Sequence, residues 1–163
     1  MIKLLFFASA LVVGGVWLAG DIARVAAPAA PPASKPEQES AGRVVLRADP
    51  DGHFRVDATI GGRRAPMLVD TGATMVALSY ENGRELGLIS GGDRFDLRVS
   101  TANGTIGAKR VVLRDLRVGS VQIQDVSAVV LSEGAMDGAL LGMSFLGRLR
   151  RMETSGDRMV LER

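Results

Sequence analysis

The sequence contains no cysteine and a single histidine, His53, among its 163 residues. The absence of cysteine excludes disulfide bonds, thiolate catalysis and zinc sites built on cysteine. A serine–histidine mechanism would depend on His53, for which no serine elbow is visible, and one histidine cannot form a zinc site alone. We therefore interpret His53 as a solvent-facing residue at the start of a strand, and we expect no metal and no cofactor.

Aromatic residues are also scarce, at 4% of the chain, whereas 47% of the residues are hydrophobic and 23% are charged. The core is therefore expected to be aliphatic. The formal net charge is only +2 and the arginines are scattered, so the basic stripe of a nucleic-acid-binding protein is missing. We expect no nucleic-acid partner. The length suits one domain with appendages.

The longest hydrophobic run lies at the N-terminus. Leu4–Gly20 carries no charge and has about the minimum length of a membrane-spanning helix, which is longer than a usual signal-peptide core. Residues 1–24 are therefore predicted to form a membrane anchor, with a cleaved signal peptide as the alternative because Val-Ala-Ala follows. Lys3 favours a cytoplasmic N-terminus, which would carry the rest of the chain across the membrane. The Pro- and Ala-rich residues 25–41 are predicted to be a semi-extended linker.

Residues 42–163 have the period of β-strands, with turn residues between short apolar runs. Residues 43–60 are predicted to form a hairpin that turns at Pro50–Gly52, and a second hairpin turns at Gly61-Gly62. The clearest hairpin spans 94–113, because Asn103-Gly104 supplies two residues suited to the positive φ angles of a tight type I′ turn.

Further short elements complete the predicted domain. Two more strands are expected around Gly119-Ser120, and a closing hairpin covers 150–163. A short helix is expected at 80–88, capped by Ser79, although Gly83 weakens it, and another follows Gly142. About nine short strands with two brief helices predict an all-β fold, a small closed or sandwiched β-domain.

Asp70 places a charge at the end of an apolar strand, in the stretch MLVDTGATMVALS (Met67–Ser79). Such a strand tends to be buried, so its last residue lies at the edge of the core, where a lone carboxylate is costly to desolvate. One interpretation is structural: the side chain accepts hydrogen bonds from the turn that follows. The other is functional, because Thr71, Gly72 and Ala73 are small and allow a second backbone or a substrate to approach. This stretch alone leaves both open.

Three ordered elements resemble the retropepsin-like (clan AA) aspartic proteases, in particular a bacterial branch anchored by a single membrane helix. They are LVDTGAT (Leu68–Thr74), TANG (Thr101–Gly104) and LLGMSFL (Leu140–Leu146). The second comes about 30 residues after Asp70 and the third about 70 residues after it. The resemblance covers residues 42–163, and it implies a small closed β-barrel of the retropepsin type preceded by an N-terminal transmembrane helix.

The resemblance implies an aspartic endopeptidase that needs no cofactor. Such enzymes hold two carboxylates about 3 Å apart that share one proton, and the ionised one activates a water that attacks the peptide carbonyl. No other aspartate in this chain precedes Thr-Gly or Ser-Gly. The second carboxylate would therefore be Asp70 of another copy, in a C₂ homodimer.

The resemblance also implies roles for individual residues. Asp70 would be catalytic. The supporting residues would be Thr71, Gly72 and Ala73 in the catalytic loop, Thr101, Ala102, Asn103 and Gly104 in a flap that closes over the substrate, and Leu140, Leu141 and Gly142 in a structural loop behind the site. The chain departs from viral members of the family at Thr74-Met75, where they carry acidic residues, and at Met143-Ser144, where they carry an arginine. These differences bear on substrate binding and on dimerisation.

A membrane tether would raise the effective concentration of the chains. We therefore expect a single-pass protein of the bacterial inner membrane with a periplasmic catalytic domain, acting on envelope or membrane-attached proteins. The alternative is a catalytically silent β-domain that binds peptides or self-associates at the membrane. A metal-dependent hydrolase would need a ligand cluster that the sequence does not show.

Overall fold

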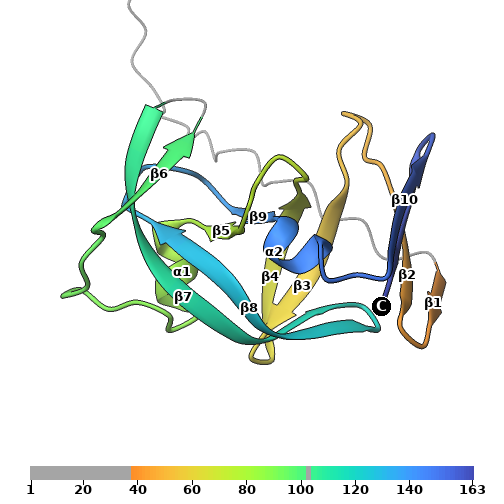
Figure 1. Ribbon diagram of the computed structural model, residues 1–163, viewed down its shortest axis with the longest axis horizontal. Coiled ribbons are helices and arrows are strands. Elements are labelled where there is room, and N and C mark those ends of the chain that lie inside the picture. The colour runs from red at the N-terminus through yellow and green to blue at the C-terminus, as the bar shows by residue number, and fades with distance from the viewer. Residues whose placement is uncertain (1–37, 102–103) are drawn as a thin grey trace, which may run out of the picture. The chain divides into compact units, whose positions relative to one another are not determined.

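The computed structural model describes residues 38–101 and 104–163, whose strands form two sheets (Figure 1). The smaller sheet contains, in spatial order, β1 (Gln38–Ser40), β2 (Arg43–Arg47), β11 (Arg158–Glu162) and β10 (Arg151–Ser155). The larger sheet contains, in spatial order, β3 (Arg55–Ile60), β4 (Arg63–Val69), β9 (Ala139–Leu141), β5 (Val76–Leu78), β8 (Val121–Leu131), β7 (Gly104–Val118) and β6 (Leu97–Thr101). Two short helices, α1 (Tyr80–Glu85) and α2 (Met143–Leu146), complete the described elements.

The larger sheet closes on itself. Its first strand, β3, pairs with β4 along one edge and with β7 along the other, where Ala58 lies opposite Val118. Six strands therefore form a complete ring, which leaves no open edge. The remaining strand, β6, pairs with β7 alone and extends the sheet beyond the ring. The predicted closed all-β barrel with two short helices is confirmed.

The core of the barrel is aliphatic, as the composition predicts. The largest fully buried side chains are leucines and valines, with Phe145 as the one aromatic among them. Val44 and Leu161, from the smaller sheet, belong to the same cluster of buried residues. Burying each such side chain contributes about 1.5–3 kcal/mol to stability, so the smaller sheet is held to the barrel by hydrophobic contact.

The structure corrects the prediction of a hairpin at residues 43–60. Across the turn only one bridge forms, between Ala48 and Phe54, and β2 pairs instead with β1 and β11. The cause is the run Val44–Leu46, in which three successive residues are buried. Successive strand residues point to opposite faces, so both faces of β2 are buried, as expected of a strand inside a sheet and not of one arm of an isolated hairpin.

A second correction concerns β7. The sequence predicted a hairpin arm ending at 113 and a separate strand after it, whereas the structure has a single strand of 15 residues. Its antiparallel ladder with β8 runs from Ala108 opposite Leu131 to Val118 opposite Val121. The ladder misses only the pair at 114 and 125, where Asp125 has a φ of 50°. One strand therefore carries the hairpin with β6 at one end and closes the barrel at the other.

The folded body extends into the predicted linker. Gln38–Ser40 pair with β2 as β1, and Gly42, with a φ of 74°, lies in the turn between them. The predicted membrane anchor at 1–24 and most of the linker lie outside the described residues. In the part of the chain that the structure describes, no helix is long and apolar enough to cross a membrane.

The helix predicted after Ser79 is confirmed, and Gly83 within it has a packing role. The Asn82 N–H donates to the Ser79 hydroxyl at 3.2 Å, which caps α1 as predicted. Gly83 is buried, and a Cβ atom on it would lie 2.5 Å from Cγ1 of Val130 on β8. The glycine that weakens the helix in isolation therefore lets α1 approach the barrel closely.

We predict that Gly83→Ala destabilises the protein by up to about 2 kcal/mol. Alanine gains roughly 1 kcal/mol of helix propensity, but overpacking against a buried valine costs about 1–3 kcal/mol. Urea unfolding of the full chain, followed by circular dichroism, measures the change. Gly92→Ala is the matched control, because a Cβ atom there meets nothing within 4 Å. A stabilised Gly83→Ala variant would contradict the close packing of α1.

Candidate active site

Asp70 is the first residue after β4, where the chain leaves the barrel wall. Its backbone N–H donates to the carbonyl of Leu141 at 3.1 Å, and its Oδ1 accepts a hydrogen bond from the Gly72 N–H at 2.8 Å. The side chain is half-buried. The turn bond expected from the structural interpretation is therefore present. Among the described residues it occupies only one carboxylate oxygen, so Oδ2 stays available.

The loop after Asp70 crosses the connection between β9 and α2. Parallel pairing of β4 with β9 places Val69 beside Leu141, and the Met143 N–H donates to the Ala73 carbonyl at 2.8 Å. Gly142 lies at the crossing: a Cβ atom on it would fall 2.2 Å from the Met75 carbonyl oxygen. No other residue type fits this position without displacing the backbone, so the glycine allows the two segments to touch.

Ser144 makes a third link between the same segments. Its hydroxyl accepts a hydrogen bond from the N–H of Val76 at 2.9 Å, across 68 residues of sequence. Val76 is fully buried. Sequence analysis treated Ser144 only as a departure from the viral pattern and missed this role. A polar residue within the apolar element LLGMSFL was the one available signal.

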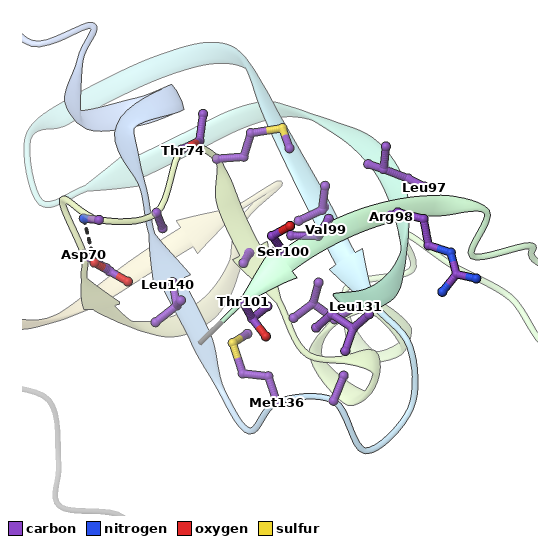
Figure 2. A pocket seen from close by; sticks show the side chains of 17 residues that line it. Asp70, Thr74, Leu97, Arg98, Val99, Ser100, Thr101, Leu131, Met136 and Leu140 are labelled. Carbon is purple, nitrogen blue, oxygen red and sulfur yellow. Dashed lines mark hydrogen bonds between the residues drawn. The ribbon is translucent and has the colours of Figure 1, made fainter. Parts of the chain in front are cut away.

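A cleft of about 880 Å³ lies beside Asp70 (Figure 2). Figure 2 shows Asp70 at one end of the cleft and Arg98 at the other. Most lining side chains are apolar, and the lining comes from the loop that begins at Asp70, from β5, β6, β7, β8 and β9, and from the loop after β8. The lining residues are Asp70, Gly72, Ala73, Thr74, Met75, Ala77, Leu97, Arg98, Val99, Ser100, Thr101, Ile106, Val129, Leu131, Ala135, Met136 and Leu140.

The hairpin of β6 and β7 forms one wall of this cleft. Thr101 lies opposite Gly104 in the ladder, and its Oγ1 donates to the Gly104 carbonyl at 2.8 Å. The predicted hairpin is confirmed, but its turn is shifted by one position. The two residues between the paired ends are Ala102 and Asn103, which lie outside the described residues, and Gly104, with a φ of 110°, begins β7.

The base of this hairpin is held by an ion pair. Asp93, before β6, lies 2.6 Å from the ammonium of Lys109 on β7, and it also accepts a hydrogen bond from the Ser90 N–H at 2.7 Å. The Lys109 ammonium, and next the Ser90 N–H, hold the pKa of the Asp93 carboxyl below its ordinary value. Because the pKa is lowered, the ion pair stabilises the folded protein fully at pH values above the ordinary carboxyl pKa of about 4. This stabilisation is lost as the pH falls through the lowered pKa.

The structure brings only some of the predicted site residues to the cleft. Asp70, Gly72, Ala73, Thr101 and Leu140 line it. Thr71 and Gly104 are exposed outside the lining, whereas Leu141 and Gly142 are buried behind it. Sequence analysis missed the wall formed by Val129, Leu131, Ala135 and Met136. These residues carry no motif, and Val129 comes near the loop through the pairing of β8 with β5, which places it beside Ala77.

His53 and its neighbours lie in a surface turn. His53 is exposed beside Asp51, with Nδ1 3.3 Å from Oδ1, and Arg55 pairs with both Asp49 and Asp51 at 2.7 Å. The solvent-facing prediction for His53 is confirmed. Over residues 38–101 and 104–163, no group of three or more histidine or acidic side chains could hold a metal ion.

Fold and site together define a class of protein. A closed six-stranded barrel, an aspartate-bearing loop crossing a glycine turn, and a hairpin beside the adjoining cleft together make the fold of an aspartic protease domain. Residues 56–148 match the family described as "gag-polyprotein putative aspartyl protease". The crystal structure of a retropepsin-like aspartic protease from Rickettsia conorii is similar, with a TM-score of 0.66 and 28% identity over 74% of this chain and 89% of that chain. The chain belongs to the retropepsin-like aspartic protease family.

Two curated bacterial proteins are also similar. One, from Sinorhizobium, is 38% identical over 125 residues, which are 77% of this chain and 54% of the relative. The other, from Rickettsia prowazekii, is 29% identical over 120 residues, 74% of this chain and 51% of the relative. Both are uncharacterized proteins. The chain spans about half the length of these relatives.

We predict that Ser144→Ala destabilises the protein by about 1–3 kcal/mol, because it leaves the buried N–H of Val76 without its acceptor. Urea unfolding of the full chain measures the loss. Ser127→Ala, at an exposed position of β8, is the matched control and is expected to change stability by less than about 0.5 kcal/mol. Equal effects of the two substitutions would contradict the assigned bond.

Proposed function

We propose that this chain is an aspartic endopeptidase that hydrolyses peptide bonds with Asp70. The observation that carries the proposal is the position of this carboxylate, at one end of an apolar cleft and walled by small residues of its own loop. Gly72 and Ala73 leave room for a peptide backbone to approach the carboxylate. Membership of the retropepsin-like family supports the same reaction.

The mechanism requires a second carboxylate. Two like charges about 3 Å apart cannot both ionise, so a pair of aspartates shares one proton. The ionised carboxylate would take a proton from water, which attacks the peptide carbonyl, and the protonated one would donate a hydrogen bond to the carbonyl oxygen. Because the chain has one Asp-Thr-Gly sequence, the partner would be Asp70 of a second copy in a C₂ homodimer.

The cleft favours apolar side chains in the substrate. Leu97, Val99 and Ile106 from the hairpin pack against a buried cluster that contains Val129 and Leu131 from β8, and all five line the cleft. Pockets of this kind bind by burying apolar surface. Closure of the hairpin, including Ala102 and Asn103, would exclude water from the bound peptide.

A catalytically silent β-domain that binds peptides is the second candidate, and the turn bond between Asp70 and Gly72 favours it. In that case the carboxylate only stabilises the turn through this hydrogen bond, and the cleft binds a peptide without hydrolysing it. The two candidates predict different effects of removing the charge of Asp70: a protease loses cleavage, whereas a silent domain has no cleavage to lose.

We predict that Asp70→Asn abolishes cleavage of denatured protein by the full chain between pH 4 and 7, while circular dichroism and thermal unfolding stay close to those of the unaltered chain. Asparagine keeps an oxygen for the Gly72 N–H but cannot share a proton. The wild-type products are expected to show apolar residues beside the cut bond, and pepstatin-like mimics of the transition state should inhibit the reaction.

Asp137→Asn, an exposed position outside the cleft, is the matched control and is expected to keep full activity. An unaltered chain that cuts no denatured protein and stays monomeric at every accessible concentration would overturn the protease proposal. Peptide binding that survives in both variants, without cleavage, would then support the silent domain.

We also propose that the chain is anchored in the bacterial inner membrane by residues 1–24, with its barrel in the periplasm. The proposal rests on the uncharged run Leu4–Gly20 after Lys3. Envelope and membrane-attached proteins are the substrates that such a tether would favour. In spheroplasts the barrel should be digested by added protease, and alkaline extraction should leave the intact chain in the membrane. Recovery in the soluble fraction would contradict the anchor.

A further inference from the structure

The cleft beside Asp70 carries charge only at its two ends. Of the described residues that line it, Asp70 and Arg98 alone have charged side chains, and Figure 2 shows them at opposite ends. Arg98 is exposed, and within residues 38–101 and 104–163 it has neither a hydrogen bond nor an ion pair. An apolar peptide bound between the two ends would leave this cation unused.

A second arginine, Arg110, lies beside the floor of the same cleft. It lies directly opposite Val129 in the ladder of β7 with β8, and Val129 lines the cleft. Directly opposite residues project from the same face of a sheet, with Cβ atoms about 4.5–5.5 Å apart. Ala108, two residues before Arg110 and therefore on the same face, is fully buried in one cluster with Val129. Arg110 thus lies where the buried floor becomes open surface.

No acidic side chain neighbours Arg110 on this face of the described sheet. Along β7 its neighbours are Ala108 and Val112, and across the ladder they are Val129 and, opposite Val112, Ser127. β6 does not reach as far as Arg110, because its pairing with β7 ends at Ala108. Arg110 is exposed and, among the residues that the structure describes, has no hydrogen bond or ion pair. Its charge is therefore available to a ligand.

The two arginines flank the same end of the cleft. Arg98 lies opposite Gly107, three residues from Arg110 along β7, so the two Cα atoms are about 11 Å apart. By strand alternation Arg110 leaves the β6–β7 hairpin on the face of the floor, and Arg98 leaves it on the other face, from the last strand of the sheet. Guanidinium groups bind carboxylates through paired hydrogen bonds. Two guanidinium groups without a carboxylate of their own favour an acidic group between them.

We propose that Arg98 and Arg110 form a subsite for an acidic side chain of the substrate, several residues away from the cut bond. The proposal rests on the proposed function, because it takes the ligand to be a peptide whose cut bond lies at Asp70. It adds a charge requirement to the apolar preference of the cleft. In a C₂ homodimer the subsite would occur once on each side of the cut bond.

The sheet indicates how far from the cut bond the acidic residue lies. Asp70 follows β4, and four strand spacings separate β4 from β7, about 19 Å at roughly 4.8 Å each. An extended peptide advances about 3.3–3.4 Å per residue. The long side chains of arginine and glutamate cover part of this distance, so we expect the acidic residue about three to five residues from the cut bond.

Peptide pairs that differ by one charge test the subsite. Each pair shares an apolar sequence and carries either Glu or Gln at one position, which is moved stepwise away from the central bond on both sides. Binding is measured by fluorescence anisotropy on the full-length Asp70→Asn chain in detergent, which the proposed mechanism leaves unable to cut the peptides. The Glu peptide should bind about fivefold more tightly at the expected positions, and high salt should weaken this preference.

Charge variants in the same Asp70→Asn background assign the preference to the two arginines. Arg98→Gln/Arg110→Gln should remove the preference for Glu, and Arg98→Glu/Arg110→Glu should favour a Lys peptide instead. Arg94→Gln/Arg117→Gln is the matched control, because it removes the same charge at exposed positions outside the cleft lining. This control should keep the preference, which separates a local subsite from a general attraction of acidic peptides to a basic protein.

Equal binding of the Glu and Gln peptides at every position would overturn the subsite. So would a preference that persists in Arg98→Gln/Arg110→Gln or that disappears in the control. Cleavage of the same peptides by the unaltered chain separates the subsite from the proposed function. Cleavage that does not discriminate between Glu and Gln contradicts the subsite alone, whereas preferential binding of the Glu peptide without any cleavage supports the subsite and contradicts the protease.

Discussion

The site depends on one backbone crossing, where the loop after β4 lies against the turn between β9 and α2. Two hydrogen bonds, from Asp70 N–H to Leu141 and from Met143 N–H to Ala73, hold the two segments together. They form only because Gly142 has no side chain to separate them. The loop is thereby fixed to β9 at Asp70 and to the first turn of α2 at Ala73. A carboxylate at the edge of an apolar core needs this rigidity, because a mobile loop would let it turn out into water.

The strands of the barrel form the cleft beside this crossing. β7 closes the ring against β3 and also carries the hairpin with β6, so the hairpin is attached to the same closed sheet as the Asp70 loop. The ion pair between Asp93 and Lys109 fixes the base of the hairpin. The stable elements are therefore continuous from the loop to the hairpin base.

Local signals predicted most of this fold and part of the site. The turn at Gly61-Gly62, the cap at Ser79 and the apolar-glycine element at Leu140–Gly142 each carry a short-range signature, and each lies where the sequence placed it. The hairpin at 43–60 was wrong because one partner of β2 is β1, in the predicted linker, and the other is β11, more than 100 residues away. Ser144 and the wall at Val129 and Leu131 escaped notice for the same reason, since their roles arise from contacts between distant segments.

The two interpretations of Asp70 prove compatible. The bond from the Gly72 N–H to Oδ1 is the turn bond that a purely structural aspartate would make. It also fixes the carboxylate plane and, within the described residues, leaves Oδ2 free to meet a water, a substrate or a second carboxylate. A structural bond to one oxygen is thus a means of orienting the other. The apolar cleft beside Asp70 is the feature that a purely structural turn would not require.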